Sequence, residues 1–185
     1  MAEATYSQAM IKVIIGLGNP GGQYSKNRHN IGFKLVDFLA EQNGGQWRKT
    51  GNMELAEVKI AQEPFDSLGH LVYLVKPLTF MNKSGDVLPF FLKKGIKAEH
   101  CLVVHDELEK PFESATLKLG GSAKGHNGLR SIIDRIGPDF WRLRLGIGRP
   151  ADKSEVATYV LSNFTQDEAL RMDSIMQQAA RLIVK

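Results

Sequence analysis

The sequence predicts an α/β fold, a single-domain three-layer sandwich in which a mixed, mostly parallel central sheet is flanked by helices. Three observations predict this class. Apolar runs of strand length alternate along the chain with segments of helical periodicity. The first of these runs is almost continuously apolar and β-branched, as in strands buried on both faces. The 185 residues, 43% of them apolar, suit one domain spanning residues 1–185 with a substantial core.

The first strand and the first helix have the clearest sequence signals. The apolar run over residues 11–17 ends at Gly18-Asn19-Pro20-Gly21-Gly22, which predicts a central buried strand followed by a loop. Apolar positions at helical spacing predict an amphipathic helix over residues 31–42, and Gly44 beyond it is a stop signal. Residues 1–10 are expected to form a flexible N-terminus.

The remaining elements alternate in type. They are predicted as strands over residues 53–60 and 71–75, a helix over 87–94, strands over 102–105 and 115–119, a helix over 127–136, a strand over 141–146, and a C-terminal helix from about residue 167. The first two of these strands are expected to join across Glu63-Pro64. Because ligands gather beyond the carboxyl ends of parallel strands, Asn19 and Asp106 fall where a site is expected.

The positive charge of the chain is concentrated in one segment. Residues 110–153 contain nine Lys or Arg and four Asp or Glu, whereas the whole chain has a net charge of +4. A Lys or Arg that neutralises a phosphate releases counterions, so this segment is suited to a nucleic-acid partner. A solvated basic face without a partner has the same composition, and charge alone leaves both interpretations open.

Several protein classes are excluded or disfavoured by composition. The longest apolar runs are far shorter than the ~20 residues that cross a bilayer, so no membrane span is expected. Residues 1–10 contain no Lys or Arg and no apolar block of signal-peptide length, so a cytoplasmic protein is expected. Cys101, the single cysteine, excludes an internal disulfide, and its apolar neighbours predict a buried packing role.

A candidate hydrolytic site comes from polar residues in separate segments, each beside Gly, Pro or a strand end: Asn19, His29, Asn82, Asp106 and Asn127. His29 is the candidate base, because imidazole has an unperturbed pKa near ~6.5. Asp106 is its expected partner, since a carboxylate fixes the imidazole tautomer and stabilises the imidazolium. The asparagine amides could donate to a carbonyl or to its developing oxyanion. The set predicts a His/Asp pair that activates water.

Each residue also has an ordinary structural interpretation. A histidine before a helix is commonly a surface or capping residue, and asparagines in Gly/Pro loops commonly form turns. His105 and His126 lack the spacing of a metal motif, so structural or supporting roles and no metal are predicted. It is the combination of His29 with the other segments that favours catalysis.

Two other functional motifs are not supported by the sequence. Gly16-Leu17-Gly18 suggests dinucleotide binding, but Pro20 and Gly21 interrupt that fingerprint and no third glycine opens a helix. The chain also has no Gly-x-Ser-x-Gly elbow, so a serine nucleophile has no support there. Attack by water is the simpler chemistry.

Five motifs together resemble the bacterial-type peptidyl-tRNA hydrolases: Gly16-Leu17-Gly18-Asn19-Pro20-Gly21, Arg28-His29-Asn30, Lys76-Pro77-Leu78-Thr79-Phe80-Met81-Asn82, His105-Asp106-Glu107-Leu108 and Gly125-His126-Asn127-Gly128-Leu129. The resemblance spans residues 11–150 in the order of the family. It implies hydrolysis of the ester that joins a peptide to the 3′-terminal ribose of tRNA, which recycles tRNA from abandoned translation. It further implies peptidyl-tRNA as the partner, no cofactor, no membrane and a monomer.

The resemblance also assigns roles residue by residue. It places the catalytic base at His29, its carboxylate partner at Asp106 and an oxyanion-side amide at Asn19. The substrate-binding positions that match are Tyr24, Met81, Asn82 and Asn127, and the tRNA-phosphate contacts that match are Lys118 and Arg144. Both of these cations lie in the basic segment, which favours nucleic acid as its partner.

The chain departs from the family pattern at two places. Ala123 and Lys124 stand where glycines are common in the family, which predicts a stiffer, more basic gating loop. The chain also has little after its last helix, so tRNA contacts made by the extreme C-terminus are expected to be fewer.

Two other functions remain open at this point. An RNA-binding protein without hydrolytic activity is one, because the family fold also serves a plant organelle intron-splicing factor, but intact His29 and Asp106 disfavour it. The other is an esterase for small N-acylated esters, which the basic segment disfavours.

Overall fold

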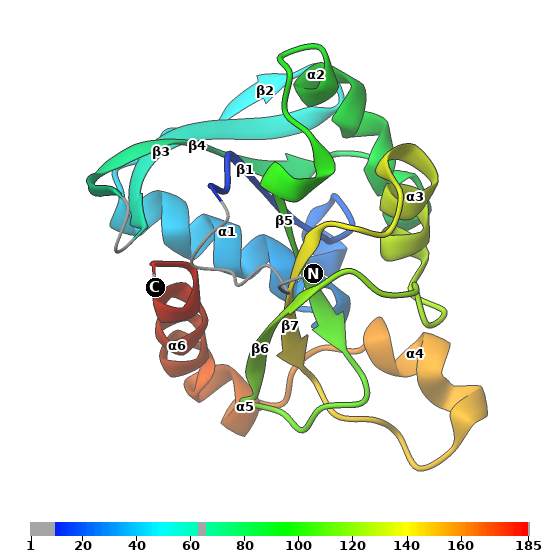
Figure 1. The fold of residues 1–185 in the computed structure, drawn as a ribbon. Helices are drawn as coiled ribbons and strands as arrows, with labels where there is room; N and C mark the ends of the chain where they lie inside the picture. Colours follow the sequence, from blue (N-terminus) through cyan, green and yellow to red (C-terminus); the bar gives the residue numbers. More distant parts are fainter. Residues whose placement is uncertain (1–9, 63–65, 185) are drawn as a thin grey trace.

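The computed structural model describes residues 10–62 and 66–184, built around a seven-stranded sheet of order β2-β3-β4-β1-β5-β7-β6 (Figure 1). The strands are β1 Val13–Gly16, β2 Arg48–Thr50, β3 Met53–Gln62, β4 Asp66–Pro77, β5 Cys101–Glu107, β6 Ala115–Leu119 and β7 Trp141–Gly146. The central strands β4, β1, β5 and β7 are parallel neighbours, while β3 and β6 run opposite to them. The sheet is therefore mixed and mostly parallel, as predicted.

Helices cover both faces of this sheet. They are α1 Ile31–Gln42, α2 Leu88–Leu92, α3 Asn127–Ile136, α4 Val156–Val160, α5 Gln166–Leu170 and α6 Met172–Val184. Buried side chains of α1 and α6 share one core with the sheet, whereas those of α2 and α3 share the other. The predicted three-layer arrangement is confirmed (Figure 1).

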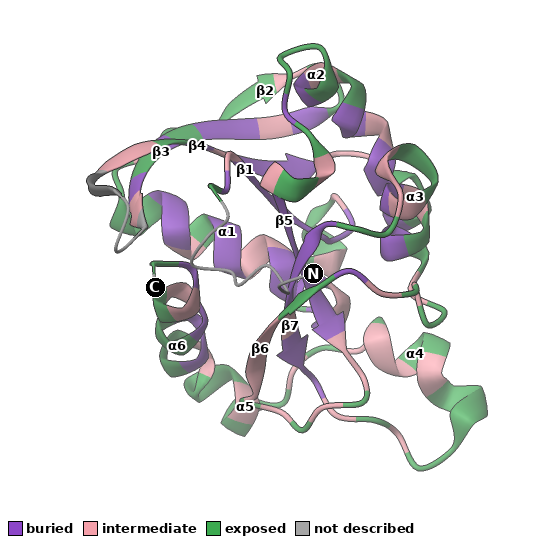
Figure 2. Cartoon of the chain, in the orientation of Figure 1, coloured by how far each residue is buried: buried purple, intermediate pink, exposed green. Residues whose placement is uncertain are grey.

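Strand β1 is central, as predicted, because both of its faces are apolar. Its residues are all buried, with Ile14 in the core under α1, and Val13 and Ile15 in the core under α2 and α3 (Figure 2). A strand covered on both faces needs no polar alternation, which explains its nearly continuous apolar run.

Glycines let α1 lie directly on the sheet next to the end of β1. A Cβ at Gly32 would lie 2.5 Å from both the Leu17 amide nitrogen and the Val104 carbonyl oxygen, and one at Gly16 would lie 2.3 Å from the Gly32 carbonyl oxygen. Contacts this short are not tolerated, so both positions need a residue without a side chain. The turn before α1 is thereby held close to the end of β5.

Predicted and observed elements differ at several places. β2 was not predicted, because its three residues Arg48-Lys49-Thr50 are polar and are held by backbone pairing with β3. α4 was not predicted, because five residues are too few for a periodic pattern. The predicted C-terminal helix is two helices, and Thr165 with Glu168 forms the capping box that starts α5.

Other predicted boundaries moved. The expected helix over residues 87–94 is the short α2, preceded by a 3-10 helix at Met81–Val87, and Pro89 stands in its first turn. The hairpin strands β3 and β4 are longer than predicted because their pairing continues beyond Ile60 and His70 to Gln62 and Asp66. The join at Glu63-Pro64 and the expected flexible N-terminus, apart from Met10, lie outside the described residues.

No helix within residues 10–62 and 66–184 is both long enough and apolar enough to cross a bilayer.

Candidate active site

A cavity of about 650 Å³ opens where β1, β5 and β7 end. Eight of the nine site residues predicted from the sequence line it: Asn19, His29, Met81, Asn82, Asp106, Lys118, Asn127 and Arg144. Tyr24 is not in the lining, but its ring meets the edge of Phe80, which is, at a centroid distance of 6.4 Å. The cavity brings together segments from residue 19 to residue 144.

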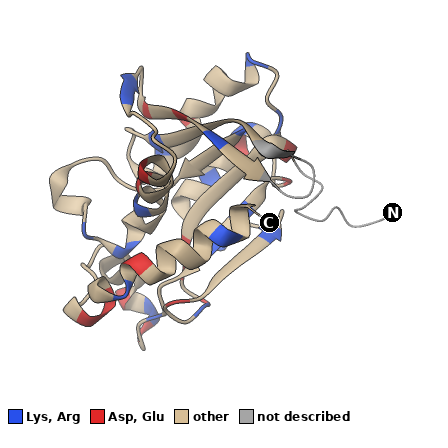
Figure 3. Cartoon of the chain, turned by 90° about the vertical axis from the view of Figure 1, so that its left-hand side faces the viewer, with Lys and Arg blue, Asp and Glu red and all other residues tan. Residues whose placement is uncertain are grey.

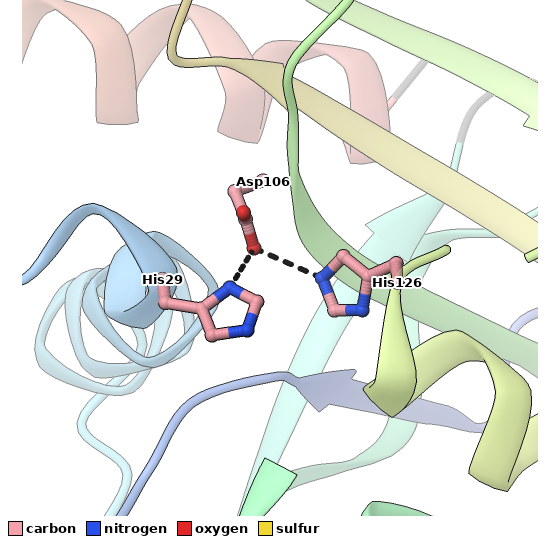
Figure 4. A group of neighbouring side chains, drawn as sticks. All are labelled: His29, Asp106 and His126. Atoms are coloured by element: carbon pink, nitrogen blue, oxygen red, sulfur yellow. Dashed lines mark hydrogen bonds and ion pairs between the residues drawn. The ribbon is translucent and has the colours of Figure 1, made fainter. Parts of the chain in front are cut away.

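His29 and Asp106 are direct neighbours in this cavity. The His29 Nδ1 atom lies 2.9 Å from Asp106 Oδ1 (Figure 4). His29 is in the 3-10 turn Arg28–Asn30 that leads into α1, and Asp106 is the second-last residue of β5 and is 4% exposed. Since an ionised carboxylate only accepts, Nδ1 carries the proton and donates it. The other ring nitrogen, Nε2, is then free to take a proton.

His126 is a third member of this cluster, which the sequence analysis assigned only a structural or supporting role. Its Nε2 lies 3.0 Å from the same Asp106 oxygen, so the two imidazoles approach one carboxylate from opposite sides (Figure 4). Its Nδ1 accepts from the amides of Gly128 and Leu129 and so caps α3. Nε2 must then carry the proton. The available sequence signal was a histidine immediately before a helix.

The interactions of Asp106 set the charge states in the cluster. Burial alone would lower the pKa of His29, but the charge of Asp106 and the hydrogen bond outweigh it and raise the pKa above 6.5. Burial would raise the pKa of Asp106, but its interactions with His29 and His126 hold it well below 3.8. Asp106 is therefore ionised at neutral pH.

His105 is unsuited to proton transfer. It is buried, and its Nδ1 lies 2.7 Å from the Asp106 carbonyl oxygen. Burial, together with His126, lowers its pKa to about 3, so the ring stays neutral. Its ring packs edge-on against that of His126, which is a structural role.

Asn19 is held in one orientation by the backbone around it. Its side-chain oxygen accepts from the Met81 amide at 2.8 Å, so its Nδ2 remains as a donor. Asn30 fixes the Asn19 backbone with two hydrogen bonds of 2.9 Å. Asn82 and Asn127 are exposed at the cavity, so Asn19 is the preorganised amide of the three.

Basic side chains form the β6–β7 side of the cavity. Lys118 pairs with Arg142 across the two strands, and Arg144 pairs with Thr116, which puts all four side chains on one face. Lys118 is exposed, whereas Arg144 is partly buried with Nη1 3.9 Å from Glu107. The side of the molecule that faces the viewer in Figure 3 carries both signs of charge.

Arg142 holds the start of the loop that was predicted from the sequence to be stiff. It is 3% exposed and donates to the backbone carbonyls of Gly121 and Ser122. Lys124 in that loop has a φ of +46°, in the left-handed region that favours glycine. The mobility of the loop stays a prediction.

A metal ion would have to compete with the hydrogen bonds of the cluster. The ligand atoms of His29, Asp106 and His126 lie within 4.8 Å of one another. Both imidazole nitrogens that face Asp106 donate protons to it, and a metal would have to replace those protons. The metal-free site stays a prediction.

Cys101 lies outside the cavity lining. It is buried at the start of β5, and burial raises its thiol pKa to about 12. It therefore lacks the reactive thiolate of a nucleophile.

The chain is similar in sequence and in fold to known proteins. Residues 13–185 match the sequence model of the family described as peptidyl-tRNA hydrolase. A peptidyl-tRNA hydrolase of Rubrobacter xylanophilus is 45% identical over 157 residues, which cover 85% of this chain and 83% of the relative. One of Streptomyces avermitilis is 40% identical over 171 residues, covering 91% and 83%. The crystal structure of peptidyl-tRNA hydrolase from Acinetobacter baumannii matches with a TM-score of 0.84 at 38% identity, covering 95% of this chain and 89% of that one.

Proposed function

This chain belongs to the peptidyl-tRNA hydrolase family, and we propose that it cleaves peptidyl-tRNA with a water molecule activated by His29 and Asp106. The reaction of the family releases peptide and free tRNA. The observation that carries the proposed mechanism is the 2.9 Å contact between His29 Nδ1 and Asp106 Oδ1 at the cavity.

The chemistry follows from the tautomer of His29. Its free Nε2 takes a proton from water as the water oxygen attacks the ester carbonyl carbon. Asp106 stabilises the imidazolium that forms. The carbonyl oxygen becomes an oxyanion, to which Asn19 Nδ2 donates. When the tetrahedral intermediate collapses, the bond to the ribose oxygen breaks and the imidazolium returns its proton to that oxygen.

The rest of the cavity suits the two halves of the substrate. Asn82 and Asn127 bind the peptide backbone, and Met81 contacts the peptide. Tyr24, beside Phe80, lies near the tRNA end. Water and the residues of the chain supply the whole reaction, so no cofactor is required. The enzyme acts as a monomer, in the cytoplasm where translation takes place.

The substrate assignment is tested with N-acetylated and free aminoacyl-tRNA. We expect the N-acetylated substrate to be strongly preferred, because its amide resembles a peptide bond and carries no charge. Parallel assays with the same N-acetylamino acid as a small ester test the requirement for tRNA. Equal cleavage of the small ester would support the small-ester esterase instead, and tRNA binding without any cleavage would support the non-hydrolytic RNA-binding protein.

Lys118→Gln and Arg144→Gln should each weaken tRNA binding across many tRNA sequences. Each removes a cation on the β6–β7 face, and a lost phosphate contact lowers the slope of log K against log salt by roughly one. The measurement is tRNA affinity at several salt concentrations. Lys93→Gln is the matched control, because Lys93 is an exposed lysine outside the cavity lining. An unchanged salt slope in both variants would rule out the proposed contacts.

A further inference from the structure

Arg28, the residue before the proposed base, is a buried cation that lies outside the cavity lining. It is 6% exposed, and its Nη2 pairs with Glu168 Oε2 at 2.8 Å. Its Nη1 donates to the Asn163 carbonyl at 3.1 Å. Its guanidinium also lies 4.7 Å from the ring centroid of Tyr159 and 5.2 Å from that of Phe164. One side chain thus binds the segment around α4 and α5 at four points.

The backbone repeats this connection. The Arg28 amide donates to the Ser162 carbonyl, and the Phe164 amide donates to the Lys26 carbonyl. Asn27 forms a β-bridge with Asn163 and donates to its side chain at 2.9 Å. The segment that follows α4 is therefore attached to the turn that carries His29.

Helix α4 has two functional sides. Val156, Ala157, Val160 and Leu161, at its end, line the cavity and give this wall its apolar character. Tyr159 instead donates its hydroxyl to the Ile147 carbonyl at 2.5 Å, and its ring lies against Arg28. Arg28 therefore supports the apolar wall of the cavity through its contact with Tyr159.

A buried ion pair is not by itself a reason for an arginine here. Desolvation of the two charges offsets much of their attraction, and an apolar side chain could fill the same space. An apolar residue cannot reproduce the contacts of the planar guanidinium. It cannot donate hydrogen bonds to a carboxylate and to a backbone carbonyl while it stacks on aromatic rings. These contacts fix the orientation of the α4 segment relative to His29, the residue that follows Arg28 in the chain.

We propose that Arg28 is a positioning residue that holds the apolar α4 wall in register with His29, so that a bound peptide presents its ester to the base. This inference rests on the proposed function. The wall is apolar, and the cations proposed to bind tRNA phosphates lie on the β6–β7 face, so the wall is assigned to the peptide part of the substrate. Arg28 therefore acts on peptide binding and leaves proton transfer intact.

The test compares two substrates, N-acetyl-glycyl-tRNA, and a peptidyl-tRNA ending in the same glycine with several apolar residues before it. In Arg28→Met the KM for the longer substrate should rise on the order of tenfold, as expected for loss of one charge-assisted hydrogen bond. The KM for the short substrate, the kcat values and the acid limb of the pH profile should stay near those of the parent. A KM rise without a kcat change is the signature of lost binding.

Arg171→Met is the matched control. Arg171 makes the same kinds of contact at the surface, with Nη1 2.9 Å from Glu113 Oε1 and its guanidinium 5.2 Å from the Phe112 ring. Its side chain is half exposed, and neither contact involves α4. It should leave both KM values unchanged. Arg28→Lys keeps both charges of the pair but lacks the planar fork, and Glu168→Gln keeps only the charge of Arg28. Both carry the test if Arg28→Met does not fold, and each should show a smaller change of the same kind.

Equal KM changes for both substrates, a fall in kcat alone, or unchanged kinetics in all three variants would overturn the positioning role. These outcomes differ from failure of the proposed function, in which the parent protein would not cleave N-acetyl-glycyl-tRNA.

Discussion

His29→Ala should lower turnover by on the order of a hundredfold to ten-thousandfold while tRNA affinity stays near that of the parent. No neighbouring imidazole can replace the base. His126 uses Nδ1 to cap α3 and its Nε2 proton for Asp106, and burial lowers the pKa of His105 to about 3, too low for an effective base. The measurement is single-turnover release of the N-acetylamino acid, with tRNA binding determined separately.

The matched control for this variant is His100→Ala. His100 lies in a short 3-10 helix before β5, outside the cavity lining, so its replacement should leave turnover unchanged. Near-normal turnover of His29→Ala would remove this residue from the mechanism.

Asp106→Asn should also lower turnover by about a hundredfold to ten-thousandfold, because an amide cannot stabilise the imidazolium or fix both imidazole tautomers. The pH profile should change as well. In the parent, kcat/KM should fall as the pH decreases through a pKa above 6.5, because protonated His29 is not a base. Without the carboxylate charge, burial dominates and lowers the pKa of His29, so this acid limb should move to lower pH.

The pH profile separates this role from a merely structural one. Asp134→Asn is the matched control, because Asp134 is an exposed carboxylate on α3, the helix that His126 caps. It should leave both turnover and the acid limb unchanged. An acid limb of Asp106→Asn at the same pH as in the parent would mean that Asp106 does not set the pKa of His29.

Elements with strong local signals were predictable from the sequence. The predicted bounds of α1, α3, β6 and β7 agree with the structure, since periodicity and turn residues mark their ends. β2 carries no such signal, because pairing with β3 defines it. α4 carries none either, because packing against Arg28 helps to hold it in place. The contact between α4 and Arg28 joins segments far apart in the chain, so it cannot be read from a short segment.

The site was predictable in composition but not in arrangement. His29 and Asp106 stand out as a base and a carboxylate at the edges of predicted elements. That they meet depends on β1 pairing with β5 and on the close approach at Gly32. The place of His126 on the same carboxylate oxygen depends on the path of the loop before α3. The role proposed for Arg28 was not predictable from the sequence, because its contacts are with a segment more than 130 residues away.

The burial of Cys101 makes the chain suitable for labelling at one chosen position. Its high thiol pKa and lack of exposure protect it from maleimide. Lys49 is exposed on β2, at the opposite edge of the sheet from β6. A fluorophore attached to Lys49→Cys would therefore be the single dye on the protein, and its polarisation would report tRNA capture without disturbing the surface that captures it.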